Sequence, residues 1–269
     1  MTILDAVWLS ILQGFTEFLP VSSSGHLVLL QQLLGTAGPG MVFFDVALHV
    51  GTLISLLVVF WKDVVGMIRS LARAIVRGHV VTSYRTDEAV RTAIMVIVAS
   101  VPAGVVGFVY QKQIEEAFTD PKLVAVNLVI TGLVLFLTRL AKPVVGKEVG
   151  FWTALLIGVG QAFAILPGIS RSGTTISAGM YAKLTPDRAA RFSFLMAMPV
   201  IAGAGLLEFR HMAGASDPIP LIPTLIGTTV SAVVGYFAIK LLLGIVHRGK
   251  FSLFAFYCLL LGTTGILFI

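Results

Sequence analysis

Two short polar segments stand out because they interrupt otherwise apolar sequence. Residues 13–26 contain a glutamate, three consecutive serines and a histidine, and residues 167–175 contain an arginine among serines, threonines and glycines. Ionisable side chains within apolar sequence are costly to place and usually serve a function. A carboxylate, an imidazole, hydroxyls and a guanidinium are the groups that phosphate transfer uses. The two segments therefore predict one shared site that handles phosphate on a lipid.

The first segment has the pattern of a helix end, a turn and a helix start. Gln13 and Glu17 are four residues apart and share one face of a helix, which Pro20 then ends. A helix that begins at Gly25-His26 directs its free N–H groups into the turn, where an anion can bind. The hydroxyls and N–H groups of the turn, predicted to contact the substrate together with Gln13, belong to Ser22, Ser23, Ser24 and Gly25.

The second segment repeats this device with a cation at its tip. Arg171 lies just before a predicted helix. A buried arginine needs an anionic partner, and its planar fork suits a phosphate bidentately. The neighbours predicted to contact the phosphate are Ser170, Ser172, Gly173 and Thr175.

Several catalytic roles remain open at this point. Ser23 is the favoured nucleophile, ahead of Ser22 and Ser24. His26 is a general base, a general acid or itself the nucleophile. Glu17 orients His26 or holds a divalent metal ion against a pyrophosphate.

A purely structural interpretation competes with this one. Hydroxyls in a turn can simply satisfy the backbone, Glu17 and Arg171 can form an intramembrane ion pair, and His26 can cap a hydrogen-bond network. The occurrence of these residue types at two matching breaks favours a site, in which Arg171 and the hydroxyls beside it stabilise developing charge.

The composition places these segments in a membrane. Hydrophobic residues make up 57% of the 269 residues and charged residues 12%, against about 25% charged in a soluble domain. The net charge of +6 comes without a basic face, so nucleic-acid binding is not expected. The single cysteine, Cys258, excludes an intrachain disulfide and a cysteine metal cluster. We expect one all-α polytopic membrane domain over residues 1–269.

Six apolar stretches approach the ~20 residues that a bilayer demands. Each of the two polar segments interrupts a further apolar stretch, Ile3–Leu34 or Phe151–Tyr181, whose halves are too short to span, so we predict two re-entrant helical hairpins. The six predicted spans are Phe43–Trp61, Thr92–Tyr110, Leu123–Thr138, Phe192–Leu207, Ile219–Lys240 and Phe251–Ile269.

The two hairpins match each other in sequence. Gln13 has a counterpart in Gln161, and Ser22 to Gly25 align with Ser170 to Gly173 at the same offset of 148 residues. The chain is therefore predicted to hold two repeats, approximately residues 1–140 and 150–269, each a hairpin plus three spans. Because three is odd, the second repeat is inverted, an arrangement that places polar sites where the repeats meet.

Basic residues set the predicted orientation. With returning hairpins, fourteen lysines and arginines fall on one side and three on the other (Lys112, Lys122 and Arg210). The rich side is predicted to be cytoplasmic, so both termini and the site face outward. Arg69, Arg73 and Arg77 form a basic helical stripe on the rich side, predicted to rest on anionic lipid headgroups. In the first span, Asp45 and His49 either line the same cavity or form a structural hydrogen-bond pair.

At this point the motifs resemble those of a known family. Residues 13–26, QGFTEFLPVSSSGH, resemble the (E/Q)-x-x-x-E plus P-x-S-S-x-G-H signature of the BacA-type undecaprenyl-pyrophosphate phosphatases. Residues 167–175, PGISRSGTT, resemble their P-G-x-S-R-S-x-x-T signature. Length and hydropathy agree over essentially the whole chain.

The resemblance implies a function and a set of residue roles. It implies hydrolysis of undecaprenyl pyrophosphate to the monophosphate carrier for peptidoglycan synthesis, bacitracin resistance, and a site open to the outer face of the bacterial inner membrane. It also implies a divalent cation, Mg2+ or Ca2+, and leaves a homodimer open. By motif position it makes Ser23 the nucleophile, with Glu17, His26 and Arg171 essential around it. Gln13 stands where many members have Glu, which weakens any metal site built on two carboxylates.

Two other function classes compete with a phosphatase. Inverted repeats around an anion site also suit a transporter that flips a polyprenyl phosphate, and a membrane scaffold would leave a buried Arg171 unexplained. The phosphatidic-acid-type phosphatases share similar chemistry, but their signature is incomplete here.

Overall fold

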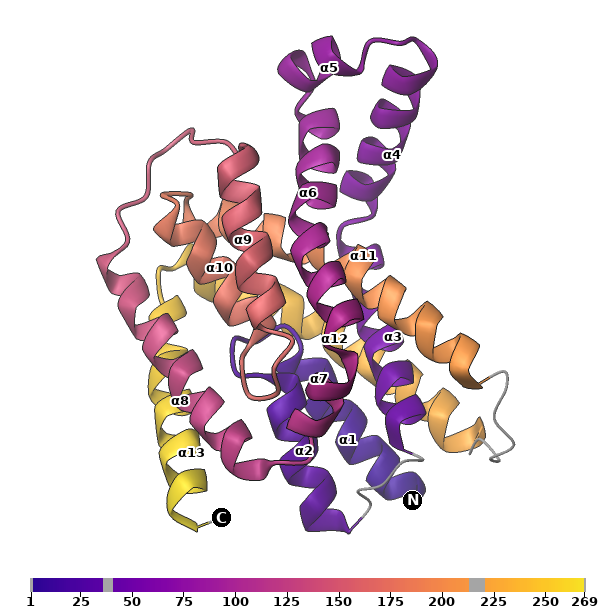
Figure 1. Ribbon diagram of the computed structural model, residues 1–269, viewed down its shortest axis with the longest axis vertical. Helices are drawn as coiled ribbons and strands as arrows, with labels where there is room; N and C mark the ends of the chain where they lie inside the picture. Colours follow the sequence, from indigo (N-terminus) through magenta and orange to yellow (C-terminus); the bar gives the residue numbers. More distant parts are fainter. Residues whose placement is uncertain (1, 36–40, 213–220, 269) are drawn as a thin grey trace.

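The computed structural model describes residues 2–35, 41–212 and 221–268, and these residues form helices and loops with no strand. Figure 1 shows the helices in chain order. The helices are α1 (Ile3–Thr16), α2 (Ser23–Leu34), α3 (Met41–Val59), α4 (Trp61–Val76), α5 (Val80–Thr86), α6 (Glu88–Val109), α7 (Gln111–Ala117), α8 (Pro121–Leu137), η1 (Thr138–Leu140), α9 (Phe151–Phe163), α10 (Arg171–Tyr181), α11 (Pro186–Met212), α12 (Leu221–His247), η2 (Phe251–Leu253) and α13 (Phe254–Phe268).

Helix lengths confirm an all-α polytopic membrane protein. Among the described residues, five helical segments are long and apolar enough to cross a bilayer, built on α6, α8, α11, α12 and α13. Helices α3 and α4 add a sixth if the pair, bent by 78°, counts as one span. All six predicted spans fall on these helices, although positions 219, 220 and 269 lie outside the described residues.

The first predicted span needs one correction. It was expected to run from Phe43 to Trp61, but α3 ends at Val59 and Trp61 begins α4. The bend turns the amphipathic residues that follow, including Arg69 and Arg73 of the basic stripe, into a separate helix alongside α6 (Figure 1), and Arg77 caps the end of that helix.

Each polar segment separates two short helices, as predicted. In the first, Ser22 caps α2 and its Oγ accepts a hydrogen bond from the Gly25 N–H at 3.3 Å. In the second, Ser170 caps α10 and its Oγ accepts one from the Gly173 N–H at 3.1 Å. The second helix of each hairpin therefore begins with the same cap, a serine three residues before a glycine. The prediction erred in starting α2 at Gly25, since it begins at Ser23.

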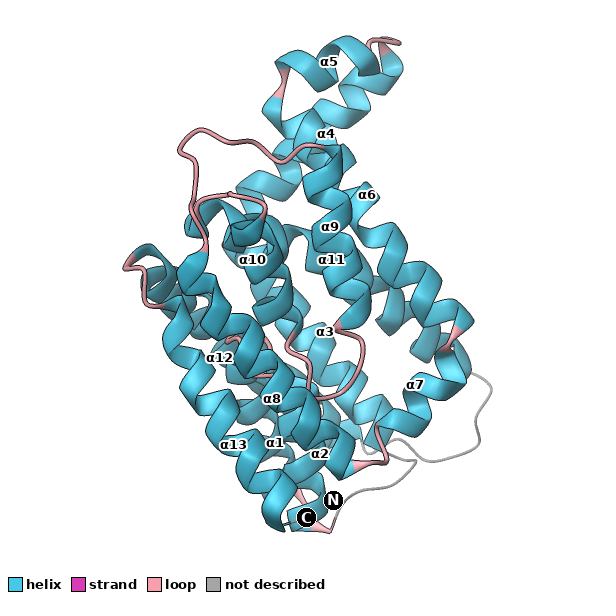
Figure 2. Ribbon diagram, turned by 60° about the vertical axis from the view of Figure 1, so that its left-hand side comes forward, coloured by secondary structure: helices cyan, strands magenta, loops and turns pink. Residues whose placement is uncertain are grey.

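The two halves of the chain interlock through their hairpins. Helix α1 packs along α12 and α9 packs along α6, so the first helix of each hairpin lies against a span of the other half. Helices α8 and α13 pack side by side (Figures 1 and 2). Small residues allow the close approach: a Cβ added to Gly158 of α9 would lie 2.4 Å from the main-chain oxygen of Ala99 on α6. These pairings fit two related halves, and the inverted relation between them stays a prediction.

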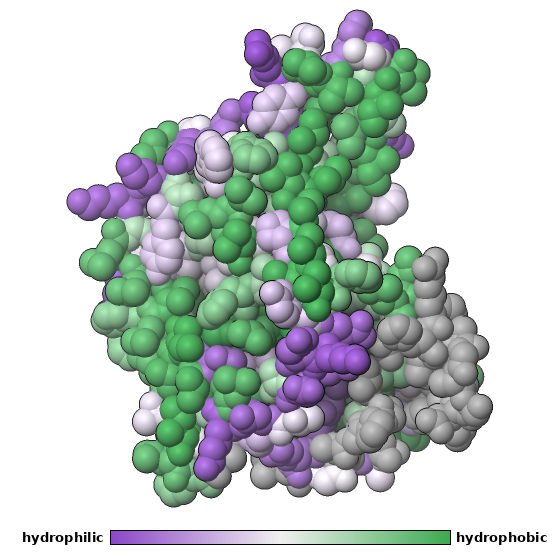
Figure 3. Space-filling model, viewed as in Figure 1, coloured by the Kyte–Doolittle hydropathy of each residue, from purple (hydrophilic) through white to green (hydrophobic). Residues whose placement is uncertain are grey.

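The surface is that of a protein surrounded by lipid. In Figure 3 the face over α6, α8 and α9 is largely hydrophobic, and hydrophilic residues gather toward its ends. Large apolar side chains are strongly exposed, including Phe108 at 82% and Trp152 at 77%. A soluble monomer rarely exposes such continuous apolar surface, so these side chains face acyl chains.

Candidate active site

The tips of the two hairpins lie against each other near the middle of the molecule (Figure 1). Ser172 Oγ donates a hydrogen bond to the Leu19 carbonyl at 3.1 Å. A Cβ added to Gly25 would lie 3.2 Å from the Cα of Gly168, so the two glycine backbones nearly touch. The tip-to-tip contact that the sequence predicted is present in the structure.

Helix α8 holds the second tip in place. Asn127 Nδ2 donates to the Pro167 carbonyl at 2.7 Å, and Thr131 Oγ1 accepts from the Ser170 N–H at 3.0 Å. Gly168 has φ +88°, and a Cβ there would lie 2.3 Å from the Val124 carbonyl oxygen. Only glycine fits this position, because both its backbone conformation and its space exclude a side chain.

Glu17 is the centre on which the two tips converge. Its side chain is 6% exposed, and its Oε1 lies 2.5 Å from Arg171 Nη2 of the second hairpin. Its Oε2 accepts hydrogen bonds from Ser23 Oγ at 2.7 Å and from Gln13 Nε2 at 2.9 Å. The predicted nucleophile and the predicted phosphate-binding cation therefore share one buried carboxylate.

Two polar atoms in this cluster are buried without a partner. Arg171 Nη1 has no hydrogen bond from the described residues, and neither has Gln13 Oε1. Leaving such atoms bare costs free energy, and native proteins keep few of them. Arg171 Nη1 can therefore donate a hydrogen bond to an anion, and Gln13 Oε1 can accept a hydrogen bond or bind a cation.

Most of the remaining hydroxyls of the tips bond to the protein itself, whereas Thr174 Oγ1 is buried with no hydrogen bond from the described residues. Those of Ser22 and Ser170 cap helices, and Ser22 Oγ also lies 3.3 Å from Ser24 Oγ. Thr175 Oγ1 donates to the Arg171 carbonyl at 2.7 Å and so steadies the first turn of α10. Their contact with a substrate stays a prediction. Ser22 adopts φ +68°, an uncommon conformation for a non-glycine residue that often marks functional sites.

His26 lies beside the cluster but is held by other groups. Its Nδ1 is 2.8 Å from the Ser22 carbonyl oxygen, and its Nε2 is 2.6 Å from the Tyr257 hydroxyl of α13. Of the two roles predicted for Glu17, orienting His26 is therefore wrong, because the hydrogen bonds of Glu17 go to Gln13, Ser23 and Arg171.

His49 joins the site from α3. Its Nε2 lies 3.5 Å from Glu17 Oε2, and its Nδ1 is 2.7 Å from the main-chain oxygen of Asp45. The Asp45 carboxylate instead accepts from Gln31 Nε2 at 2.7 Å. Of the two interpretations of the Asp45 and His49 pair, His49 lining the shared site is confirmed, and their link runs through the backbone.

The residues present fit a divalent cation that arrives with a pyrophosphate. Within the described ranges, no group of three or more His, Cys, Asp or Glu residues could hold a metal ion by itself. Mg2+ is usually bound through one or two carboxylates plus substrate phosphates. The Glu17 carboxylate and the unpaired Gln13 Oε1 supply two such oxygens.

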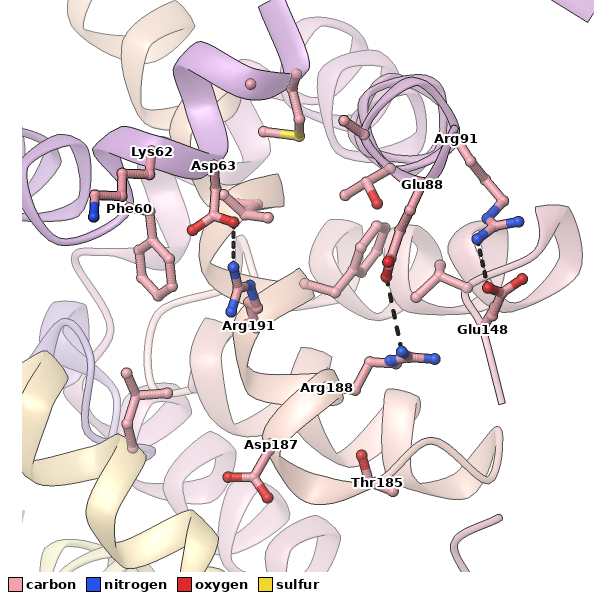
Figure 4. Close-up of a pocket in the computed structure, with 18 residues that line it drawn as sticks. Phe60, Lys62, Asp63, Glu88, Arg91, Glu148, Thr185, Asp187, Arg188 and Arg191 are labelled. Carbon is pink, nitrogen blue, oxygen red and sulfur yellow. Dashed lines mark hydrogen bonds and ion pairs between the residues drawn. The ribbon is translucent and has the colours of Figure 1, made fainter. Parts of the chain in front are cut away.

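A large charged cavity lies away from this cluster and is lined by ion pairs (Figure 4). Its volume is about 830 Å³, and Glu17, Ser23 and Arg171 are not among its lining residues. Its charged lining comprises four basic and four acidic residues, so it offers no excess positive charge to a pyrophosphate. These are Lys62, Arg91, Arg188 and Arg191, and Asp63, Glu88, Glu148 and Asp187.

Comparisons with known proteins give matches over nearly the whole chain. The model of a family described as bacitracin resistance protein BacA matches residues 6–264. The undecaprenyl-diphosphatase of Desulfosudis oleivorans is 44% identical over 268 residues, which cover 96% of this chain and 96% of that protein. The undecaprenyl-diphosphatase of Desulforapulum autotrophicum is 40% identical, over 99% of this chain and 98% of that protein. The undecaprenyl-diphosphatase of Halothermothrix orenii is 39% identical, over 97% of this chain and 96% of that protein.

Proposed function

Because this chain belongs to the bacitracin resistance protein BacA family, we propose that it hydrolyses undecaprenyl pyrophosphate to undecaprenyl phosphate and inorganic phosphate. The observation that carries the proposal is the shared carboxylate. Glu17 accepts a hydrogen bond from the Ser23 hydroxyl at 2.7 Å and pairs with Arg171, whose second guanidinium nitrogen is buried without a partner among the described residues. A nucleophile, a proton acceptor and a phosphate-binding cation thus lie within one cluster.

The distances in this cluster support a role for each of its three charged or nucleophilic groups. Ser23 Oγ attacks the terminal phosphorus as its proton passes to Glu17 Oε2, and the bond from that phosphorus to the bridging oxygen breaks, releasing undecaprenyl phosphate. Water then attacks the phosphorus of the phosphoserine, the bond from phosphorus to Ser23 Oγ breaks, and the proton held by Glu17 returns to Ser23 Oγ as inorganic phosphate leaves. Arg171 binds the transferring group through Nη1 while Nη2 keeps Glu17 in place. When the phosphate takes part of the arginine's charge, Glu17 becomes a better proton acceptor.

A divalent cation, Mg2+ or Ca2+, would be held by Glu17 and Gln13 Oε1 and would neutralise pyrophosphate charge. The basic-residue asymmetry supports placing this site, and both termini, on the outer side of a bacterial inner membrane. In that position the enzyme recycles the lipid carrier of cell-wall synthesis.

The proposal is tested by phosphate release from undecaprenyl pyrophosphate in detergent. Wild-type protein should release phosphate, Ser23→Ala should abolish release, and Ser100→Ala, whose hydroxyl bonds only within its own helix, should match wild type. Substantial activity in Ser23→Ala would move the nucleophile to His26 or to water. Substrate binding without release by the wild type would contradict a phosphatase and favour a polyprenyl-phosphate transporter.

A further inference from the structure

Tyr257 brings the last helix of the chain onto the first hairpin. Its hydroxyl oxygen lies 2.6 Å from His26 Nε2, across a separation of 231 residues. The two rings are nearly parallel, with an interplanar angle of 9° and centroids 5.7 Å apart. The next residue, Cys258, contacts the same tip through its Sγ, 3.5 Å from the Pro20 carbonyl oxygen. Helix α13 therefore forms a wall of the tip, and Tyr257 is the polar group in that wall.

The partners of His26 determine where its proton lies. The Ser22 carbonyl oxygen can only accept, so Nδ1 carries hydrogen and donates to it. In the neutral ring Nε2 then has a lone pair, and the Tyr257 hydroxyl donates to that lone pair. The same Ser22 oxygen also accepts the His26 backbone N–H at 3.2 Å. Ser22 and Tyr257 thus fix both nitrogens of the ring.

Tyr257 differs in exposure from the imidazole that it holds. His26 is 8% exposed, whereas Tyr257 is 46% exposed. The Tyr257 hydroxyl makes the hydrogen bond to the site, and its ring stacks on the imidazole. The His26 side chain hydrogen-bonds the Ser22 carbonyl and the Tyr257 hydroxyl.

We propose that Tyr257 is a positioning residue of the phosphatase site: by holding His26 Nε2 it keeps the imidazole donating to the Ser22 carbonyl, and so steadies the turn that carries Ser23. This inference rests on the proposed function. Without the hydroxyl the imidazole keeps one anchor, at Nδ1, and its ring can turn about that contact. A hydrogen bond of this kind has a net value that corresponds to about a two- to tenfold change in rate. Because Tyr257 acts through His26, the loss should fall on kcat and leave KM unchanged.

Tyr181 provides a matched control. It is 42% exposed, and its hydroxyl also makes one hydrogen bond, to the Val134 carbonyl at 2.5 Å. Both substitutions, Tyr257→Phe and Tyr181→Phe, therefore remove a hydroxyl oxygen from a similarly exposed ring. Only Tyr257→Phe removes a hydrogen bond to a histidine. In detergent, Tyr257→Phe should lower kcat about two- to tenfold at constant KM, and Tyr181→Phe should keep both. Equal rates in the two variants, or a loss confined to KM, would overturn the inference.

A spectroscopic measurement reports the contact without relying on turnover. Protein labelled with 15N-histidine shows the Nε2 resonance of His26, identified by its absence in His26→Gln. Tyr257→Phe should shift this resonance and Tyr181→Phe should not, and an unchanged resonance in Tyr257→Phe would overturn the inference. A wild type that releases no phosphate would contradict the proposed function itself, whereas an active wild type with an equally active Tyr257→Phe contradicts only the role of Tyr257.

Discussion

Replacing Arg171 should separate its two tasks, because its two terminal nitrogens have different partners. Nη2 lies 2.5 Å from Glu17 Oε1, and Nη1 is buried and unpaired. Arg171→Lys keeps a single ammonium group, which can stay paired with Glu17. It has no second nitrogen to bind a phosphate at the same time. Arg171→Gln removes the cation and leaves a carboxylate that is 6% exposed without its counter-charge.

The structure gives different magnitudes for the two variants. Arg171→Gln should lower the free energy of unfolding by about 3–5 kcal/mol, the usual cost of breaking a buried ion pair from one side. Arg171→Lys should lower it by no more than about 1.5 kcal/mol, the net value of one hydrogen bond. Both should lower kcat/KM about 100- to 1,000-fold, because both remove a preorganised donor to the transferring phosphoryl group.

Denaturant unfolding and phosphate release measure these two effects separately. Arg91→Gln is the matched control, since Arg91 Nη2 also lies 2.5 Å from a carboxylate but its partner, Glu148, is 51% exposed. That variant should lose at most about 1 kcal/mol. Full activity in Arg171→Lys would refute the role of Nη1, and equal destabilisation by Arg171→Gln and Arg91→Gln would refute a buried charged pair.

Three further predictions concern the tip, the neighbouring imidazole and the topology. Gly168→Ala should destabilise the protein by about 1–3 kcal/mol in denaturant unfolding, because its backbone is left-handed and a main-chain oxygen fills the Cβ position. Gly203→Ala, where a Cβ meets open space, is its control. His49→Ala should slow phosphate release about two- to tenfold by loosening Glu17. A cysteine at Lys122 should react with an impermeant maleimide added to cells, and one at Arg77 should not.

Each of these predictions has an outcome that contradicts it. Equal stability of the two glycine variants would mean that the second tip is not as tightly held as described. An unchanged rate in His49→Ala would remove His49 from the site. Ready labelling at Arg77 would overturn the orientation inferred from basic residues, and the native cysteine cannot mimic it because Cys258 is buried.

The parts of the site that depend on local sequence could be predicted. The spacing shared by Ser22–Gly25 and Ser170–Gly173 is visible in the sequence, although these serines were expected to contact the substrate and not to cap helices. The pairing of Glu17 with Arg171 follows from the need of a buried arginine for an anion, and was expected as part of the structural alternative. The start of α2 was misplaced because Ser23 and Ser24 favour turns as well as first helical turns.

The contacts that depend on helix packing could not be predicted. Tyr257 approaches His26 only because α13 lies against the first tip, and nothing in an apolar span indicates which neighbour it will have. The one signal was a tyrosine within that span, whose hydroxyl needs a partner. The bend after Val59 was missed for the same reason, since the residues around it, 56–61, are all apolar.

The most direct test of the account is whether the two hairpin tips meet. A Cβ added to Gly173 would lie 3.3 Å from the Cβ of Pro20, close to the ~3.5–4.5 Å of a disulfide. Pro20→Cys with Gly173→Cys, in a Cys258→Ala background with a protease site in the exposed loop at residues 142–150, should yield fragments that stay joined until a thiol is added. The pair Pro20→Cys with Gly203→Cys, whose second position also lies beyond the cleavage site and has nothing within 4 Å of an added Cβ, should give separate fragments. Separate fragments from the first pair under oxidising conditions would contradict the shared site.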